Sequence, residues 1–279
     1  MNYEIEIIIF SKDRPWQLSQ TLRSLYKYCL DIKLAKIRVI IKSDVLYGKY
    51  YLELAKNYST SRGNIYFTSE YDFEFQTKEF INLGNSKYIM FITDDCLFFR
   101  TFELKNAIEI LRNHPEVYNY SYRLSPQLNY CHPANQRMVC PPIKFDKNSN
   151  GIYEYNKGNF CFAYPFDLTC SVYRRSDVQE LAKNIHFKNP NYFEEQGYLY
   201  CLNNGIINSR FGAMPIYQRV VSIVCNRVQN SHNNPIYTEI ERSPEQLLEL
   251  FKLNLDFDDE FYDRKDYNSV HVGDFVLKI

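Results

Sequence analysis

Residues 86–99 read Ser86-Lys-Tyr-Ile-Met-Phe-Ile-Thr-Asp94-Asp95-Cys-Leu-Phe-Phe99, and this stretch decides the fold. The apolar run from Tyr88 to Ile92 is short and bulky, as in a central strand of a parallel sheet that is buried on both faces. Two carboxylates follow this strand directly. Ligands of open α/β sheets bind just beyond the carboxyl ends of the strands. We therefore expect a binding site at Asp94 and Asp95.

Two adjacent carboxylates repel each other unless a positive charge lies close to them. Unit charges about 4 Å apart interact by about 4 kcal/mol at an effective dielectric constant of about 20. A divalent cation that bridges to a phosphate-bearing ligand would remove this repulsion, and Mg²⁺ and Mn²⁺ favour carboxylate oxygens. A solvated Asp-Asp turn is the alternative that the dipeptide alone leaves open.

The composition limits the class of protein. The chain has 279 residues, 45% of them hydrophobic, which allows one large α/β domain or two small ones. Its formal net charge is zero, which argues against nucleic acid as the main partner. The eight cysteines form no Cys-x-x-Cys pair, so we expect free thiols in a reducing compartment and no zinc site. Without a signal peptide or a bilayer-spanning stretch, the sequence predicts a soluble, cytoplasmic protein.

The first hundred residues alternate between strands and helices, which is typical of a parallel sheet with right-handed crossovers. Strands are expected over 5–10, 37–41, 64–67 and 88–92, with helices over 15–29, 51–58 and 73–83. Polar residues collect where three of these strands end: Ser11, Asp13, Arg14, Ser43, Asp44, Asp94 and Asp95. No glycine-rich dinucleotide or P-loop motif is present, so metal and side chains would have to hold any phosphates.

The rest of the chain is less regular. Further elements are expected as a helix over 104–111, strands over 118–122, 160–164 and 220–225, and helices with capping boxes at Ser176 and Ser243. Residues 124–160 are predicted to be a long, proline-rich connection of the kind that forms a lid or binding loop. Its tyrosines and asparagines (Tyr130, Asn135, Tyr153, Tyr155 and Asn156) would stack on a sugar ring, or else lie on a surface hairpin.

Four short motifs, taken in order, resemble those of family-two-like glycosyltransferases of GT-A fold. They are Ser11-Lys-Asp-Arg-Pro-x-Gln-Leu, Phe91-Ile-Thr-Asp94-Asp95, Asn189-Pro-Asn-x-x-Glu194 and Asn226-x-Val-Gln229. The resemblance spans most of the chain and implies an α/β fold with a mixed, mostly parallel central sheet flanked by helices. It also implies a single domain over 1–279, with a nucleotide-sugar-binding half (1–96), an acceptor-binding half (97–235) and a C-terminal helical extension (236–279).

The resemblance implies roles for the polar residues at the strand ends. Asp95 would be the ligand of a Mn²⁺ or Mg²⁺ ion bridged to the diphosphate of the donor, while Asp94 would face the ribose or the donor sugar. A C-terminal histidine completes the metal shell in some enzymes of this fold, which suggests His232 or His271. The remaining donor contacts would be Ser11, Asp13 and Asp44 at the base and ribose, and Arg14 and Lys78 near the phosphates.

Inverting members of the family use a carboxylate of the acceptor-binding half as general base. Motif position favours Glu194, with Glu195 as the second choice; stabilisation of a helix N-terminus is the alternative for this acidic pair. The base would deprotonate the acceptor hydroxyl as it attacks the anomeric carbon, and the metal would stabilise the departing nucleoside diphosphate. The chain departs from the usual pattern twice, because the acid after the second strand is displaced to Asp44 and the base motif reads Glu-Glu instead of Glu-Asp.

The resulting hypothesis is a metal-dependent, inverting glycosyltransferase that uses a UDP- or GDP-sugar and a glycan or lipid-linked acceptor. A sugar-nucleotide nucleotidyltransferase is one alternative, although it would carry a glycine-rich loop where residues 11–15 have none. A catalytically inactive carbohydrate-binding or interaction protein is the other. A homodimer and a peripheral membrane contact are both compatible with the 25 tyrosines and 20 phenylalanines.

Overall fold

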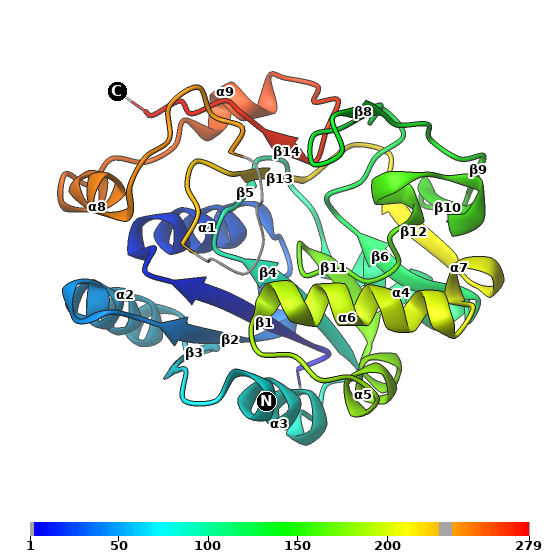
Figure 1. The fold of residues 1–279 in the computed structure, drawn as a ribbon, viewed down its shortest axis with the longest axis horizontal. Coiled ribbons are helices and arrows are strands. Elements are labelled where there is room, and N and C mark those ends of the chain that lie inside the picture. Colours follow the sequence, from blue (N-terminus) through cyan, green and yellow to red (C-terminus); the bar gives the residue numbers. More distant parts are fainter. Residues whose placement is uncertain (1–2, 229–235, 279) are drawn as a thin grey trace.

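The computed structural model describes residues 3–228 and 236–278, and a nine-stranded sheet forms its centre (Figure 1). The strand order is β3-β2-β1-β4-β11-β6-β12-β10-β9. Its first four strands in the chain pair in parallel: β1 (Ile5–Lys12), β2 (Ala35–Lys42), β3 (Ile65–Ser69) and β4 (Tyr88–Thr93). The predicted parallel half is therefore confirmed, with each strand close to its expected range.

Three helices connect these strands: α1 (Pro15–Tyr28), α2 (Val45–Arg62) and α3 (Phe73–Leu83). The leucines at positions 18, 22 and 25 of α1 are fully buried, as their helical spacing predicts. Pro15 stands in the first turn of α1, where its missing N–H leaves no hydrogen bond unmade. Helix α2 ends at Gly63, whose φ of +72° is the left-handed conformation that glycine adopts without a steric penalty.

The second half of the sheet is mixed. Strand β11 (Ser171–Arg174) pairs antiparallel with both β4 and β6 (Val117–Ser121), and the sheet continues through β12 (Phe211–Pro215), β10 (Asn150–Glu154) and β9 (Ile143–Phe145). The helices of this half are α4 (Leu104–Asn113), α5 (Arg175–Lys183), α6 (Pro190–Asn203) and α7 (Ile206–Ser209). The central sheet is thus mixed and flanked by helices, as the resemblance implies.

The C-terminal segment returns to the N-terminal half. It contributes α8 (Pro244–Lys252), α9 (Asp259–Asp263) and β14 (His271–Val272), and β14 forms a small sheet with β13 (Val220–Ile223) and β5 (Cys96–Phe98). The predicted capping box of Ser243 is present. Trp16 of α1 joins the two parts, because its ring packs on Phe257 and its Nε1 donates to the carbonyl of Leu255 at 2.7 Å. Within the described residues, no helix has the length and apolar character to cross a bilayer.

Residues 124–160 are more ordered than the sequence predicts. They contain β9 and β10, a hairpin of β7 (Tyr130–Cys131) and β8 (Gln136–Arg137), a short 3₁₀ helix (Tyr155–Lys157) and the first residue of a second one (Phe160–Ala163). The sugar-stacking prediction is wrong for Tyr153 and Tyr155, which are 2% and 0% exposed. Tyr153 belongs to β10, which pairs with β12, and the hydroxyl of Tyr155 donates to Asn119 Oδ1 of β6 at 2.8 Å.

Two further sequence predictions are wrong. Within the expected strand 160–164, Phe160–Ala163 form a 3₁₀ helix. The predicted capping box at Ser176 is absent, because α5 begins at Arg175 directly after β11 and has no side-chain cap.

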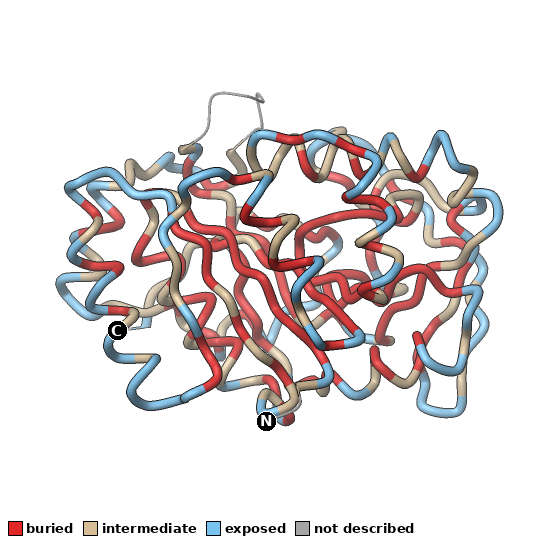
Figure 2. Tube along the Cα trace, turned by 90° about the horizontal axis from the view of Figure 1, so that it is seen from below, coloured by how far each residue is buried: buried red, intermediate tan, exposed pale blue. Residues whose placement is uncertain are grey.

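The core connects the two halves of the sheet, as the buried strands in Figure 2 show. Phe91 of β4 lies at its centre and is completely buried. Its ring contacts Phe10 of β1 on one side and the rings of Phe166, Tyr173 and Phe193 from the second half. This aromatic cluster holds the parallel and mixed halves together.

We expect Phe91→Ala to lower the free energy of unfolding by about 3–5 kcal/mol, because it removes buried area and leaves a cavity between rigid neighbours. Urea denaturation measures this change. Phe75→Ala is the matched control, since Phe75 is 60% exposed on α3. Equal losses of stability in the two variants would contradict the central role of Phe91.

Candidate functional site

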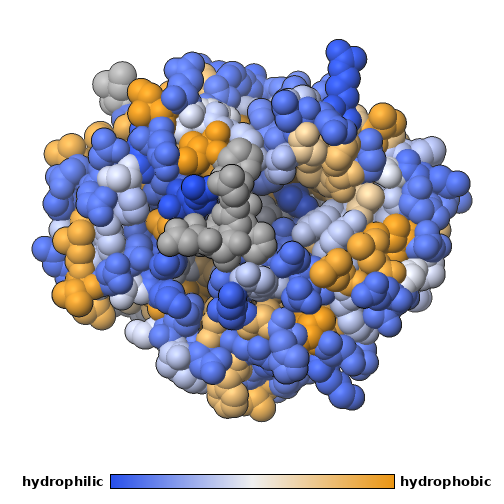
Figure 3. All heavy atoms as spheres, viewed as in Figure 1, coloured by the Kyte–Doolittle hydropathy of each residue, from blue (hydrophilic) through white to orange (hydrophobic). Residues whose placement is uncertain are grey.

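A cleft of about 1080 Å³ lies at the carboxyl ends of β1 and β4 and extends to α6 and β14. Figure 3 shows the surface hollowed near the centre of this face. Seven predicted site residues line the cleft: Ser11, Arg14, Asp94, Asp95, Glu194, Glu195 and His271. Asp13, Asp44 and Lys78 are not among the described residues that line it, and His232 lies outside the described residues.

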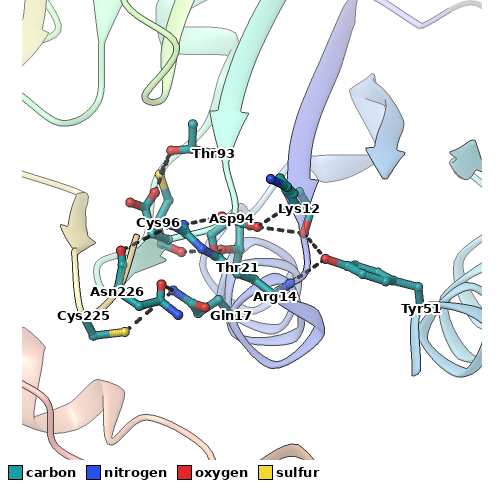
Figure 4. A network of polar contacts seen from close by, with 12 residues as sticks. Lys12, Arg14, Gln17, Thr21, Tyr51, Thr93, Asp94, Cys96, Cys225 and Asn226 are labelled. Carbon is teal, nitrogen blue, oxygen red and sulfur yellow. Dashed lines mark hydrogen bonds and ion pairs between the residues drawn. The ribbon is translucent and has the colours of Figure 1, made fainter. Parts of the chain in front are cut away.

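The carboxylate of Asp94 is buried, and both of its oxygens accept hydrogen bonds (Figure 4). It accepts hydrogen bonds from Ser11 Oγ at 2.7 Å and from the backbone N–H of Lys12 at 3.3 Å, and Arg14 Nη1 lies 3.0 Å from its second oxygen. Burial raises the pKa of Asp94 to about 6, opposed by the positive charge of Arg14 and increased by the negative charge of Asp95. Asp94 therefore joins the end of β4 to the last residues of β1 and to Arg14 in the loop that follows.

Asp95 has different partners. Its Oδ1 accepts a hydrogen bond from Thr93 Oγ1 at 2.7 Å, and its backbone carbonyl accepts one from the N–H of Ile223 in β13 at 2.9 Å. Thr93 also lines the cleft. The two neighbouring acids are thus held by separate sets of donors, Asp94 by the end of β1 and Arg14, and Asp95 by Thr93 and by β13.

Polar side chains of α1 and α2 form hydrogen bonds to Asp94 and to its neighbours Ser11 and Arg14. Thr21 Oγ1 lies 2.9 Å from the carbonyl oxygen of Asp94. The hydroxyl of Tyr51 is hydrogen-bonded to Ser11 Oγ at 2.7 Å and accepts from the backbone N–H of Arg14 at 2.8 Å. Helical spacing identified Tyr51 only as a helix residue, and its contact with the β1 loop is a tertiary feature.

The first and fourth sequence motifs contact each other in this corner. Gln17 Nε2 donates to Asn226 Oδ1 at 3.3 Å, and Arg14 Nη2 donates to the carbonyl of Asn226 at 3.3 Å. Lys12 Nζ donates to the carbonyl of Val228 at 2.8 Å. The segment after β13 therefore closes one side of the cleft through bonds to the loop after β1.

Three residues that were predicted to bind the nucleotide-sugar, Asp13, Asp44 and Lys78, form hydrogen bonds elsewhere in the structure. Asp13 adopts a positive φ of 53° and accepts a hydrogen bond from the backbone N–H of Asp44 at 2.7 Å, which places it at the start of α2. Burial raises the pKa of Asp13. Lys78 Nζ donates to Glu74 at 2.7 Å and to the carbonyl of Ile185 at 2.8 Å, so it joins α3 to the segment after α5.

The opposite wall of the cleft carries Glu194. Its helix begins at Pro190 and is capped by the side chain of Asn189. The backbone N–H of Leu168 donates to Glu194 Oε2 at 2.9 Å. Burial raises the pKa of Glu194 to about 7, and the nearby negative charge of Asp167 adds to this rise.

A buried ion pair beside Glu194 was not found from the sequence. Arg123 Nη2 lies 3.2 Å from Asp167 Oδ2, and the two side chains are 6% and 1% exposed. Asp167 also accepts from the N–H of Thr169 at 2.8 Å and from Ser171 Oγ at 2.7 Å. Arg123 lines the cleft and lowers the pKa of Glu194 by its positive charge. No local motif marks either partner, since they come from separate irregular segments.

His271 stands at the edge of the cleft on β14. Burial lowers the pKa of its ring to about 3, so the ring is neutral at physiological pH. Its Nδ1 is buried and has no hydrogen-bond partner among the described residues. Over the same described ranges, no three His, Cys, Asp or Glu side chains are grouped closely enough to bind a metal ion by themselves.

Known proteins resemble this chain in sequence and in fold. No protein-family model matches the chain. A bifunctional glycosyltransferase of Dictyostelium discoideum, pgtA, is 27% identical over 300 aligned residues, which cover 98% of this chain and 39% of that protein. The chain therefore spans about two fifths of the length of this curated relative.

Solved structures show the same architecture. S. aureus TarS superposes with a TM-score of 0.51 and 13% identity, covering 81% of this chain and 37% of TarS. Residues 1–349 of TarS in complex with UDP-GlcNAc give a TM-score of 0.50 and 13% identity, with 91% and 65% of the two chains covered. The fold is of the GT-A type. The resemblance to GT-A glycosyltransferases that the four motifs indicated is confirmed.

We expect Arg14→Met and Asp94→Asn each to destabilise this GT-A domain by about 3 kcal/mol, because each leaves a buried group without its partner. The double variant should lose less stability than the sum of the two, and a double-mutant cycle of urea denaturation measures the difference. The exposed pair Arg264 and Glu260 on α9 provides the control cycle, which should show no coupling. Additive effects at Arg14 and Asp94 would contradict an energetic coupling of this pair.

Proposed function

We propose that the chain is a glycosyltransferase that moves a sugar from a nucleotide-sugar donor to a hydroxyl acceptor with inversion at the anomeric carbon. One observation carries the proposal: Asp94 and Asp95, which directly follow the parallel strand β4, line the same cleft as the carboxylate of Glu194 on α6. The similarity to a named glycosyltransferase over nearly the whole chain supports it. In this proposal residues 1–96 supply most of the donor side and residues 97–235 most of the acceptor side.

The part of the cleft that would bind the nucleotide-sugar contains N–H groups that are free to donate hydrogen bonds. Arg14 Nε and Asn226 Nδ2 are buried in the lining of the cleft and have no partner among the described residues. Unpaired buried N–H groups are costly, and phosphate oxygens are strong acceptors for them. TarS structures include complexes with UDP and with UDP-GlcNAc, so a uridine diphosphate donor is the first to test here, with a GDP-sugar as the second.

The residues present fit a divalent cation that takes most of its ligands from phosphate and water. Mg²⁺ sites of this kind need only one or two protein carboxylates, and Asp95 supplies one at the cleft. The neutral, unpartnered Nδ1 of His271 offers a nitrogen ligand in the lining of the same cleft. A bound Mn²⁺ or Mg²⁺ would neutralise charge on the departing diphosphate. Asp95 and His271 would hold it.

Glu194 fits the role of general base. Its carboxylate is held by the N–H of Leu168 and faces the cleft, so one oxygen is placed to accept the proton of an acceptor hydroxyl. The hydroxyl oxygen forms the new bond to the anomeric carbon while the bond from that carbon to the diphosphate oxygen breaks. Glu195 also lines the cleft and is the second choice.

Two substitutions separate the proposed donor and acceptor roles. We expect Asp95→Asn to abolish the Mn²⁺-dependent part of UDP binding, since the proposed metal ligand is lost. Glu194→Gln should bind UDP like the parent and lose transfer by at least about a hundredfold, the usual contribution of a general base. Calorimetric titration with UDP and with GDP, each with and without Mn²⁺, measures binding, and product analysis measures transfer.

Glu195→Gln is the matched control, because it removes the neighbouring carboxylate from the same helix. It should retain most of the transfer rate. If Asp95→Asn and Glu194→Gln both bind and transfer like the parent, the proposed function is wrong. Full activity in Glu194→Gln with loss in Glu195→Gln would instead assign the base to Glu195.

The pH dependence of transfer should report the ionisation of Glu194. The base works only when ionised, and its pKa is raised to about 7, so kcat/KM should rise with pH with a midpoint near 7. The charged or titratable groups that influence Glu194 are Asp167, Arg123 and Tyr164, and Leu168 contributes its N–H.

Substitution of the buried charges of Arg123 and Asp167 should shift this midpoint in opposite directions. Arg123→Met removes a cation that lowers the pKa of Glu194, so the midpoint should move to higher pH. Asp167→Asn removes an anion that raises this pKa, so the midpoint should move to lower pH. Rate profiles of kcat/KM between pH 5 and 9 measure both shifts, and a midpoint that neither variant moves would contradict the assignment of the base.

A further inference from the structure

An aromatic pair lies directly beside the proposed base. Tyr198 follows Glu194 by one turn of α6, and its ring stacks on that of Tyr164 with a centroid distance of 4.4 Å and an interplanar angle of 22°. Both tyrosines line the cleft, and Tyr164 lies close enough to Glu194 to lower the pKa of its carboxyl group. A flat aromatic surface and a carboxylate are therefore held next to each other on one wall.

Close packing fixes the position of this wall. Gly197, between Gln196 and Tyr198, lies so close to the core that an added Cβ would be 2.2 Å from a ring carbon of Phe166. Phe166 is completely buried and contacts Phe91 and Phe193. Because the glycine allows α6 to approach the core, Tyr198 and Glu194 are presented to the cleft from a rigid support.

Unpartnered hydrogen-bond donors lie in the same part of the cleft lining. Arg123 Nε and Asn191 Nδ2 are buried without a partner among the described residues. Since buried N–H groups are costly when unpaired, these atoms point to a ligand that supplies oxygen acceptors. The charge of Arg123 is already met by Asp167, so a neutral hydroxyl oxygen satisfies its Nε without a further anion.

We propose that Tyr198 and Tyr164 form the platform for the acceptor, and that the acceptor is a neutral sugar ring. A pyranose has an apolar face of C–H groups that stacks on an aromatic ring, and hydroxyls at its edge that accept from Arg123 Nε and Asn191 Nδ2. An acyl chain would leave both donors unpaired. An anionic group would be repelled by Glu194 and Glu195, which line the same wall.

This inference rests on the proposed function, because it takes Glu194 as the base that receives the proton of the acceptor hydroxyl. The stacked ring directs one hydroxyl of the sugar toward that carboxylate. Tyr198 is thus a binding residue that determines which acceptors can bind, and it does not accept a proton.

The test uses the full chain with UDP and the diamagnetic ion Mg²⁺ and, as probes, the methyl β-glycosides of glucose, galactose and N-acetylglucosamine. Saturation-transfer NMR should show contact of the protein with ring C–H protons of at least one glycoside. Tyr198→Ala should weaken binding of that glycoside by about tenfold, on the scale of the loss of one aromatic contact. Tyr198→Phe keeps the ring and should bind within about twofold of the parent.

Tyr217→Ala is the control, since Tyr217 is 49% exposed and is not among the described residues of the cleft. UDP binding should be the same in all three variants, which shows that the fold and the donor site are intact. Equal glycoside binding by Tyr198→Ala and the parent would overturn the platform, as would a parent that binds UDP but none of the glycosides. Failure of every protein to bind UDP would instead count against the proposed function.

Discussion

A carboxylate that is removed from water needs hydrogen-bond donors or a positive charge beside it, and Asp94 is such a buried carboxylate in this protein. Ser11, the backbone of Lys12 and the guanidinium of Arg14 meet it, and the bond from Arg14 to Asn226 extends the network to the segment after β13. One buried charge thus joins the end of β4, the loop after β1 and a distant part of the chain. The position of Asp95 at the cleft depends on this anchor.

The second wall of the cleft depends on the reversal of strand direction at β11. Because β11 runs antiparallel between β4 and β6, the residues just before it, including Asp167 and Leu168, are carried to the same edge as the ends of the parallel strands. There they meet Arg123, which follows β6, and Glu194 of α6. A sheet that continued in parallel would place the segment before β11 at the opposite edge.

The two walls have different chemical characters. The corner of Asp94 and Asp95 combines carboxylates with unpaired N–H groups, which suits a phosphate group with its counterion. The wall of Glu194 combines one carboxylate of raised pKa with stacked tyrosines, which suits a neutral polyhydroxyl ring. Such a division matches a reaction in which a charged donor and an uncharged acceptor meet between two surfaces.

The sequence by itself determined the parallel half of the sheet, the range of α3, the cap of α8, and the place of Asp94 and Asp95 after β4, because periodicity, caps and strand ends act over a few residues. Tertiary structure decided which distant side chains meet. It paired Arg123 with Asp167, turned Tyr153 into the core, kept Lys78 out of the cleft lining and brought Tyr164 onto Tyr198. These choices follow from packing between segments far apart in the chain, which no local pattern contains.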